Sequence, residues 1–256
     1  MQVVILEDAD AIGDFAADMI LRGIGDGSLR VLGVATGSSP LPVYRALARR
    51  RVAGLADLTA FALDEYVGLP YEHPQSYHAV IDREVTAPLR LDPARVHVPD
   101  GNAADPRQAC ADYEERIRAS GGIDLQILGI GSTGHIGFNE PTSSLASRTR
   151  IKTLTPETRE DNARFFDGPD EVPLHCMTQG LGTIMDAREV LLIAQGPRKA
   201  HAVAQAIEGP LTSMCPGSVL QLHPNATIVL DEDAASELTL RDYYRFVFDN
   251  RPDWQR

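Results

Sequence analysis

The chain has 256 residues, of which 43% are hydrophobic and 23% are charged, and its formal net charge is −12. The composition is that of an ordinary globular protein, and the acidic balance argues against nucleic acid or an anionic membrane as a partner, since both need a basic face. A small phosphorylated ligand is not excluded, because backbone amides and a few local cations can hold a phosphate inside an acidic protein.

No apolar run approaches the about 20 residues that a membrane helix needs. The opening stretch MQVVILEDAD lacks the basic and apolar regions of a secretion signal. The three cysteines, Cys110, Cys176 and Cys215, form no CxxC pair. We therefore expect a cytoplasmic protein with reduced thiols.

Short apolar segments alternate along the chain with stretches of helical periodicity. The candidate strands are Val3–Leu6, Arg30–Ala35, Ala60–Leu63, Val96–Val98, Asp124–Ile130, Val190–Ala194 and Ala226–Leu230. The candidate helices are Ala9–Arg22, Leu41–Arg51, Ser76–Thr86, Ala104–Ala119, Pro197–Glu208 and Ala234–Asp249. Nearly continuous apolar strands, each followed by a helix, predict a parallel sheet covered on both faces, which is a doubly wound three-layer α/β sandwich.

No linker rich in Pro, Gly or Ser divides the sequence, so residues 1–256 are expected to form a single domain. Residues 144–179 fit the alternation poorly, because they are first polar and basic and then rich in turn residues. We interpret this stretch as a lid over the sheet edge. Ligands of open α/β sheets bind beyond the carboxyl ends of the strands, so the chemistry is expected in loops that follow strands.

The first such loop reads ATGSSPL and begins at Ala35. Gly37, Ser38 and Ser39, next to a helix N-terminus, would offer amides and hydroxyls to a phosphate. The alternative is a plain helix start, with Ser39 as the N-cap and Pro40 in the first helical position. No lysine follows the glycine as in GxxxxGK[ST], so hydrolysis of a nucleoside triphosphate is not expected.

The second loop reads LDEYVGLP and follows the candidate strand Ala60–Leu63. Asp64 is the first polar residue after this strand, so it is expected at the carboxyl edge of the sheet, facing the crevice. A carboxylate there could move a proton between adjacent carbons of a bound sugar. An aspartate that caps a turn or a helix is the open alternative.

The third loop reads LGIGSTGHIGFNEP. Among the seven histidines, His135 is the one that lies between glycines at a strand end. Histidine changes charge near neutral pH and can take a proton from one oxygen and return it to another. Glu140 is close enough in sequence to assist. A structural histidine that closes a turn is the alternative.

Two cations follow in suitable contexts, Arg164 in DNARFFDG and Lys199 in GPRKAHAV. Each could contact a phosphate, and each could equally be a solvated surface residue. What favours the functional interpretation is that all of these loops converge on one sheet edge in the predicted fold.

These segments together resemble the glucosamine-6-phosphate deaminase family. ATGSSP, LDEYVGLPYEHPQSY, GHIGFNEP, SSLASRTRIKTL, NARFFDG and LQLHP occur in that family's order over nearly the whole chain. The resemblance implies a Rossmann-like α/β sandwich that converts glucosamine 6-phosphate and water to fructose 6-phosphate and ammonia. This is an aldose–ketose isomerisation with hydrolysis of a C–N bond, in amino-sugar metabolism. The resemblance implies neither a metal nor an organic cofactor.

The resemblance also assigns roles to the predicted residues. His135 matches the histidine that opens the sugar ring, Glu140 the glutamate that supports it, and Asp64 the base that moves the C2 proton to C1. The phosphate pocket matches Gly37, Ser38, Ser39, Arg164 and Lys199.

Thr133 departs from the family pattern, because the family has an aspartate at this position. A threonine can accept a hydrogen bond from an imidazole N–H, but it cannot neutralise an imidazolium. We therefore expect ring opening to be weakened while the deamination chemistry is kept.

Some members of the family are hexamers that N-acetylglucosamine 6-phosphate activates at a subunit interface. Ser143, Arg150 and Lys152 match positions used there, so the resemblance implies a homo-oligomer with an activator site. The alternative for the basic residues is a solvated strand.

Two other functions stay open at this point. The same pocket would suit another sugar-phosphate isomerase or a lactonase, although lactone hydrolysis would need an activated water and not the proton shuttle of Asp64. The chain could also be a non-catalytic sugar-phosphate-binding regulator, which the loss of the acid at Thr133 favours.

Overall fold

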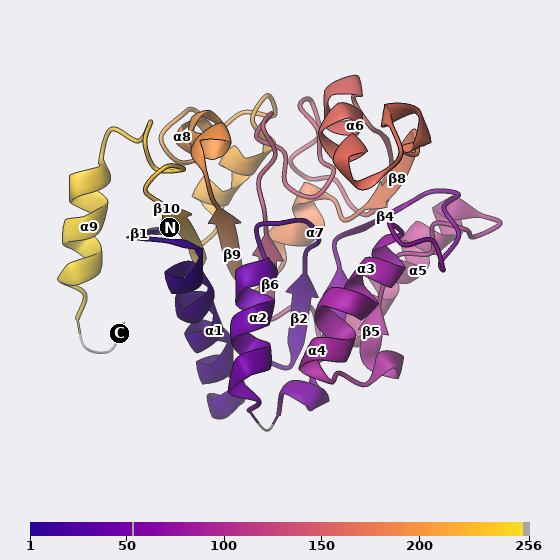
Figure 1. The fold of residues 1–256 in the computed structure, drawn as a ribbon, viewed down its shortest axis with the longest axis horizontal. Helices are drawn as coiled ribbons and strands as arrows, with labels where there is room; N and C mark the ends of the chain where they lie inside the picture. Colours follow the sequence, from indigo (N-terminus) through magenta and orange to yellow (C-terminus); the bar gives the residue numbers. More distant parts are fainter. Residues whose placement is uncertain (53, 253–256) are drawn as a thin grey trace.

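The computed structural model describes residues 1–52 and 54–252 of the chain (Figure 1). Its centre is a seven-stranded parallel sheet in the order β1-β10-β9-β6-β2-β3-β5. The strands are β1 (Gln2–Leu6), β2 (Val31–Val34), β3 (Thr59–Ala62), β5 (Val96–His97), β6 (Leu125–Leu128), β9 (Glu189–Ala194) and β10 (Ala226–Asp231). Each corresponds to one of the predicted strands, so the predicted parallel sheet is confirmed.

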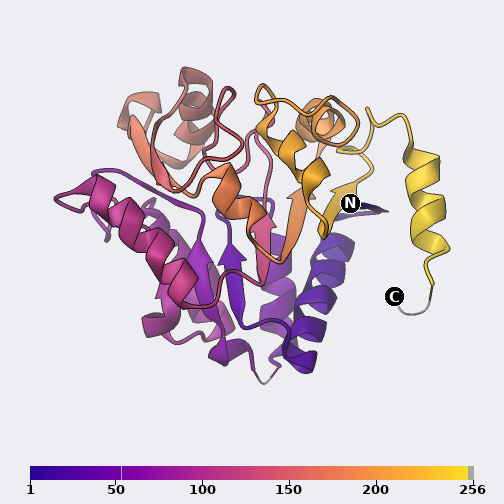
Figure 2. The same cartoon turned by 180° about the vertical axis from the view of Figure 1, so that it is seen from behind.

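Helices cover both faces of this sheet, which makes the Rossmann-like sandwich of three layers. Helices α1, α2 and α4 lie in front of the sheet in Figure 1, and α5 and α7 lie in front in the reverse view of Figure 2. The α-helices are α1 (Ala9–Asp26), α2 (Leu41–Arg50), α3 (Tyr77–Ile81), α4 (Ala87–Leu89), α5 (Pro106–Ala119), α6 (Pro156–Asn162), α7 (Leu181–Met185), α8 (Ala200–Ile207) and α9 (Arg241–Asp249).

Shorter helical turns join these elements. They are the 3-10 turns η1 (Leu55–Asp57), η3 (Pro93–Arg95), η4 (Ala163–Phe165), η5 (Pro169–Glu171), η6 (Pro197–Lys199) and η7 (Pro216–Leu222), and the π-helical turn η2 (Asp82–Thr86). Among the described residues, no helix combines the length and the apolar character needed to cross a membrane.

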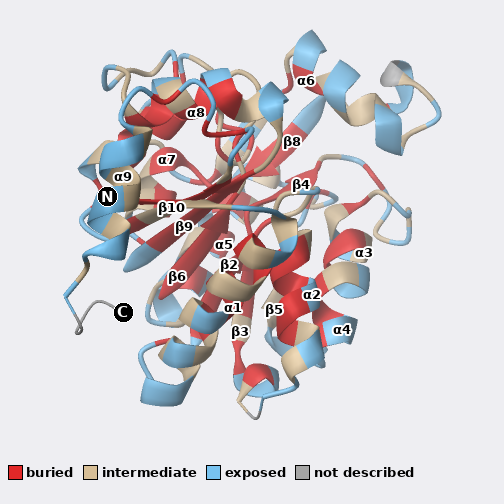
Figure 3. Cartoon of the chain, turned by 60° about the vertical axis from the view of Figure 1, so that its left-hand side comes forward, coloured by how far each residue is buried: buried red, intermediate tan, exposed pale blue. Residues whose placement is uncertain are grey.

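The core lies between the layers, because the central strands are buried on both faces. All four residues of β2 and of β6 are buried, and Figure 3 shows the strands as buried and the helices as buried on their inner sides. Polar outer faces and apolar inner faces of helices are what a sandwich requires. The apolar strand composition therefore explains the architecture directly.

A second sheet was not predicted. It has three antiparallel strands in the order β4-β8-β7, which are β4 (Asp64–Tyr66), β7 (Arg150–Thr153) and β8 (His175–Thr178). Two of these strands lie within residues 144–179, which also contain α6. In Figures 1 and 2 this segment lies beyond the carboxyl ends of the central strands. Residues 144–179 are thus partly regular structure.

Two helix predictions need correction. Residues 234–240 are not helical: residues 234–237 form turns, since Asp231 Oδ1 accepts the Ala234 N–H at 2.7 Å, and α9 begins only at Arg241. Helix α2 begins at Leu41 with Pro40 as the N-cap, and no side chain caps it, so Ser39 is not the N-cap.

The strand order places the functional loops. From β2 the chain proceeds outward through β3 to β5, and from β6 it proceeds the opposite way through β9 to β10, beside which the first strand, β1, forms the edge. The direction therefore reverses between β2 and β6. In open α/β sheets the ligand crevice lies at this switch point, beyond the carboxyl ends of the strands. The loops after β2 and β6 are two of the three loops singled out in the sequence.

Candidate active site

A cavity of about 570 Å³ opens at the switch point. Seven predicted residues from five separate parts of the chain line it, namely Gly37, Ser38, Ser39, Asp64, His135, Arg164 and Lys199. Residues 144–179 contribute to the same lining through Thr158, Asp161 and Phe166. The sequence-predicted loops thus share one cavity.

The loop after β2 is shaped to present backbone amides. Gly37 has a φ of +90°, which side-chain-bearing residues rarely adopt. The buried Tyr44 hydroxyl donates to the Ala35 carbonyl at 2.8 Å and accepts the Ala35 N–H at 3.0 Å, so the start of the loop is fixed. Within the described chain, no hydrogen bond occupies the backbone N–H groups of Gly37, Ser38 and Ser39. These groups are available to an anion.

Three cations lie around this loop. Lys199 ends η6 just before α8, Arg198 precedes it, and Arg164 lies in η4; all three line the cavity. Burial lowers the pKa of Lys199, the nearby Asp161 charge opposes this, and Arg164 and Arg198 lower the pKa further. A dianionic phosphate would relieve the repulsion among the cations.

Asp64 lies at the point where the chain leaves the central sheet. It is the first residue of β4, directly after Leu63, whose N–H donates to Val34 of β2 at 3.1 Å. The residue is 6% exposed, and its carboxyl faces the third loop, since a Cβ added to Gly137 would lie 3.8 Å from Asp64 Oδ2. Burial, and secondarily the charge of Glu65, raises the pKa of Asp64 to about 8. Such a carboxyl is suited to exchange protons near neutral pH.

Glu65 points away from the cavity and anchors α3. Its carboxylate accepts the N–H groups of Tyr66, Tyr77 and His78 at 2.7–2.8 Å. Burial raises the pKa of Glu65, although these three bonds oppose the rise. Two adjacent carboxylates therefore have different environments, because one is satisfied by amides while the other is left without a hydrogen bond in the described chain.

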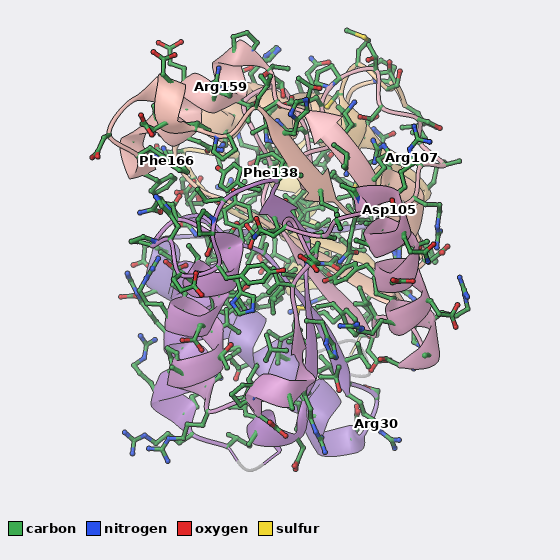
Figure 4. All side chains as sticks on the ribbon, turned by 90° about the vertical axis from the view of Figure 1, so that its right-hand side faces the viewer. Arg30, Asp105, Arg107, Phe138, Arg159 and Phe166 are labelled. Atoms are coloured by element: carbon green, nitrogen blue, oxygen red, sulfur yellow. The ribbon has the colours of Figure 1, made fainter. Side chains whose placement is uncertain are left out.

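An aromatic wall borders Asp64. The rings of Tyr77 and Phe138 stack at 6.0 Å, and Tyr66 contacts both Tyr77 and Phe166. Asn162 of α6 donates to the Tyr66 hydroxyl at 3.0 Å. Figure 4 shows Phe138 between the central sheet and the segment that carries Phe166, with Arg30 at the opposite end of the sheet. This wall gives one side of the cavity an apolar surface.

His135 is held by two side chains of its own loop. Its Nδ1 lies 2.9 Å from Thr133 Oγ1 and 3.2 Å from Glu140 Oε2. Thr133 Oγ1 in turn donates to Glu140 Oε2 at 3.2 Å. The carboxylate partner of the imidazole is therefore Glu140, and the threonine hydroxyl joins the two groups.

Glu140 is buried behind His135, outside the cavity lining. Burial alone would raise the pKa of Glu140, but the bond and charge of His135, with the hydroxyls of Thr158 and Thr133, hold it below its usual range. An ionised carboxylate at Nδ1 leaves Nε2 to act on the ligand. The His135 ring packs directly on Gly131, where any Cβ would overlap it.

The three candidate activator positions lie elsewhere. Ser143, Arg150 and Lys152 are absent from the cavity lining, and Arg150 donates to Asn139 Oδ1 at 2.8 Å. The buried atoms Ser143 Oγ and Arg150 Nη2 have no hydrogen-bond partner among the described residues. Across residues 1–52 and 54–252, no group of three His, Cys, Asp or Glu side chains could hold a metal ion.

Comparison with known proteins decides the family. The model of the glucosamine-6-phosphate isomerases/6-phosphogluconolactonase family matches residues 7–229. The chain belongs to this family. It is 57% identical over 257 residues to the glucosamine-6-phosphate deaminase of Pseudarthrobacter chlorophenolicus, with 100% of this chain and 99% of that protein covered.

Solved structures of the isomerase/lactonase family give the same fold. A glucosamine-6-phosphate deaminase described as monomeric is 38% identical, with a TM-score of 0.89, and covers 93% of this chain and 100% of its own. The 6-phosphogluconolactonase from Trypanosoma cruzi is 18% identical, with a TM-score of 0.74, and covers 93% of this chain and 97% of its own. The second likeness concerns the fold alone.

Arg198 and Gln195 are among the cavity residues that were missed in the sequence analysis. Arg198 lines the cavity beside Lys199, and the PRK run had already shown two adjacent cations. Gln195 also lines the cavity and donates to the Ser39 carbonyl at 3.2 Å. No sequence signal marks this glutamine, because its partner lies 156 positions away along the chain.

Proposed function

We propose that the chain is a glucosamine-6-phosphate deaminase, which converts glucosamine 6-phosphate and water to fructose 6-phosphate and ammonia. One observation carries the proposal, namely that three features share one cavity. They are an anion cradle, formed by the loop of Gly37, Ser38 and Ser39 with Arg198 and Lys199, a carboxyl with a raised pKa, Asp64, and a histidine with a carboxylate partner. The names of the relatives support the same reaction. No metal or organic cofactor is part of the proposed reaction.

In the first proposed step the phosphate binds to Gly37, Ser38 and Ser39, with Arg164 and Lys199 as counter-charges. His135 then takes the proton of the anomeric hydroxyl and returns a proton to the ring oxygen, so the C1–ring oxygen bond breaks and an open-chain aldehyde forms. Glu140 stabilises the imidazolium that exists between the two transfers.

In the second proposed step Asp64 removes the proton from C2 and the electron pair forms a double bond between C1 and C2. The aldehyde oxygen takes a proton from the substrate's own ammonium group, which gives an enol with a neutral amine on C2. The same carboxyl delivers a proton to C1, which leaves an iminium at C2. Water adds to C2, the C2–N bond breaks, and ammonia departs with the ketone, fructose 6-phosphate. A clamped phosphate is what would align both carbons with Asp64.

An ammonia-coupled assay tests this function. Equal amounts of ammonia and fructose 6-phosphate from glucosamine 6-phosphate would support the deaminase. Isomerisation of another sugar phosphate, or lactone hydrolysis, without ammonia would indicate the wider family. Binding without turnover would indicate a regulator. Running galactosamine 6-phosphate in parallel would show which amino sugar is preferred.

The proposed attenuation of ring opening rests on Thr133. Thr133→Asp is expected to raise kcat about fivefold, because a charged acceptor at Nδ1 makes a stronger hydrogen bond to an imidazolium than a hydroxyl does. The measurement is kcat on the cyclic sugar. Thr133→Asn, which is similar in size and uncharged, is the matched control and should give no gain. A Thr133→Asp rate no higher than that of the asparagine variant would show that Glu140 alone suffices.

We also propose that N-acetylglucosamine 6-phosphate activates the enzyme through Ser143, Arg150 and Lys152. The unpartnered Ser143 Oγ and Arg150 Nη2 support a ligand there, and Lys152 lies two residues further along β7. The resemblance implies a ligand at a subunit interface, so the proposal includes a homo-oligomer.

Lys152→Met is expected to raise the half-saturating concentration of the activator about tenfold, because a charged hydrogen bond to the ligand is lost. The readout is the rate ratio with and without activator. Arg148→Met is the control, because Arg148 is paired with Glu114 at 2.9 Å and Asp186 at 2.6 Å. Equal activation of the wild type and the Lys152 variant would refute the site.

We also propose that residues 144–179 act as a lid within a single domain and that the protein is cytoplasmic. The lid is supported by four of its residues that line the cavity, namely Thr158, Asp161, Asn162 and Phe166. Cys110, Cys176 and Cys215 are free and buried, which fits a reducing cytoplasm.

A further inference from the structure

The anion cradle has two halves that come from strands which are not neighbours. One half is the loop after β2, which contains Gly37, Ser38 and Ser39, and the other is the turn after β9, which carries Arg198 and Lys199. Strand β6 lies between β2 and β9 in the sheet. The backbone hydrogen bonds of the sheet therefore do not set the gap between the halves directly.

The first half is held at its two ends. Tyr44 fixes the backbone of Ala35 through two hydrogen bonds. At the other end Gln195 Nε2 donates to the Ser39 carbonyl at 3.2 Å. Among the described residues, no other side chain donates to the Ser39 carbonyl, so one amide fixes this end of the loop.

The second half, the turn after β9, is anchored to the central sheet. The Gly196 N–H donates to both carboxylate oxygens of Asp231, at 3.0 and 2.9 Å, and Gly196 has a φ of +82°. Asp231 ends β10, which pairs with β9, and it also accepts the Ala234 N–H. The backbone next to Gln195 is thus anchored to two strands of the sheet.

The hydrogen bond from Gln195 passes over the end of β6. Gly129, the first residue after β6, faces Ser39, since a Cβ added to Gly129 would lie 3.6 Å from Ser39 Cβ. The chain continues from there to His135. The hydrogen bond between Gln195 and Ser39 therefore spans the position where the loop that carries His135 begins.

We propose that Gln195 is a positioning residue that joins the two halves of the anion cradle and fixes Ser39 relative to Lys199. The inference rests on the proposed function, because it deepens the assignment of the phosphate pocket. A dianion that contacts both halves needs a fixed gap between them, and a loose loop would have to be ordered at the moment of binding.

The expected effect falls on binding and not on chemistry. The phosphate is held equally in the ground state and in the transition state, so loss of its pre-set cradle raises KM and leaves kcat nearly unchanged. A variant that merely loosened the fold would instead lower the melting temperature without this split. The split between KM and kcat therefore separates positioning from stability.

Gln195→Leu tests the inference, because leucine keeps the approximate size and removes the donor. We expect the dissociation constant of inorganic phosphate, measured by calorimetry, and the KM for the sugar phosphate to rise about threefold to tenfold. We expect kcat to stay within about twofold. Gln195→Glu should weaken phosphate binding more than leucine does, because it adds a negative charge and cannot donate to a carbonyl when ionised.

Gln221→Leu is the matched control. Gln221 Nε2 also donates to backbone carbonyls, those of Ala206 and Gly209 at 2.9 Å, but this residue does not line the cavity. Its replacement should lower the melting temperature and leave the affinity for phosphate unchanged.

The outcomes distinguish the role of Gln195 from the proposed deaminase activity. Wild-type phosphate affinity in Gln195→Leu, or a fall in kcat at constant KM, would overturn the role of Gln195 while ammonia release by the wild type kept the deaminase proposal intact. Phosphate binding without ammonia release would overturn the deaminase proposal and leave Gln195 testable by calorimetry. A wild type that does not bind phosphate would overturn both.

Discussion

Asp64→Asn is expected to lower ammonia release from glucosamine 6-phosphate about a thousandfold, because it removes the group that takes the C2 proton. The measurement is kcat in the ammonia-coupled assay. Binding of inorganic phosphate should stay close to that of the wild type, since Asp64 lies in a different loop from Gly37 and Ser38. Turnover of Asp64→Asn within tenfold of the wild-type rate would mean that another group moves the proton.

The wild type should show the pH dependence of this carboxyl. Asp64 acts only when ionised, and its pKa in the folded protein is raised from 3.8 to about 8. We therefore expect kcat/KM to increase as the pH is raised toward about 8 and to level off above it. A profile that is flat across neutral pH would contradict the assignment of Asp64 as the free enzyme's base.

The stability of Asp64→Asn serves as its folding control. Because the pKa of Asp64 in the folded protein lies above 3.8, ionisation does not lower the free energy of unfolding while the carboxyl is protonated in both the folded and the unfolded state. The loss of stability from the buried charge grows as the pH rises to about 8. An amide has no charge to desolvate. The variant should therefore be at least as stable as the wild type, and its advantage should be larger at pH 8 than at acid pH. An inactive but stable variant places the loss in the chemistry.

Glu140→Gln is expected to lower kcat about a hundredfold to a thousandfold, because the imidazolium of His135 would lose the carboxylate that lies 3.2 Å from its Nδ1. The amide retains the size of the side chain, and it can still contact the Thr158 hydroxyl. The loss should appear in kcat, with inorganic phosphate binding unchanged, because Glu140 lies outside the cavity lining.

Glu157→Gln is the control for this experiment. Glu157 accepts from Ser132 at 3.3 Å in the same loop region but does not contact His135. A Glu140→Gln rate similar to that of the Glu157 variant would remove Glu140 from the ring-opening step and leave Thr133 as the partner of His135.

The central sheet could be predicted because its strands are nearly continuous apolar runs. VLGV of β2 and LQIL of β6 are buried on every side, and burial on both faces gives a signal that needs no tertiary information. The second sheet could not, since β4 has three residues and RIKT of β7 alternates between half-buried and exposed in a basic stretch. Such short pieces become strands only by pairing with β8.

The helix expected at residues 234–240 failed for a similar reason. The alanines and Leu238 have helical periodicity, but Asp231 closes a turn on Ala234, and Glu208 takes the N–H groups of Thr239 and Leu240 at 2.8 and 3.0 Å. Carboxylates from outside the segment therefore determine where α9 begins.

The candidate site was predictable where a residue follows a strand. Asp64 and His135 were found because the carboxyl ends of parallel strands meet at one edge. Glu140 was expected to assist His135 because it follows five residues later, and its carboxylate lies 3.2 Å from Nδ1. Gln195 could not be found, because its partner lies in another loop, 156 positions away along the chain. The sequence indicated the missing charge at Thr133, but not that its hydroxyl bridges His135 and Glu140.

Tracing one hydrogen would examine the chemistry most directly. Glucosamine 6-phosphate labelled with deuterium at C2 is incubated with the enzyme, and the product is followed by NMR. If Asp64 carries the hydrogen from one carbon to the next, a measurable fraction of the label appears at C1 of fructose 6-phosphate, with one ammonia released per sugar. Ammonia formed with no label at C1, or no ammonia at all, would contradict this mechanism.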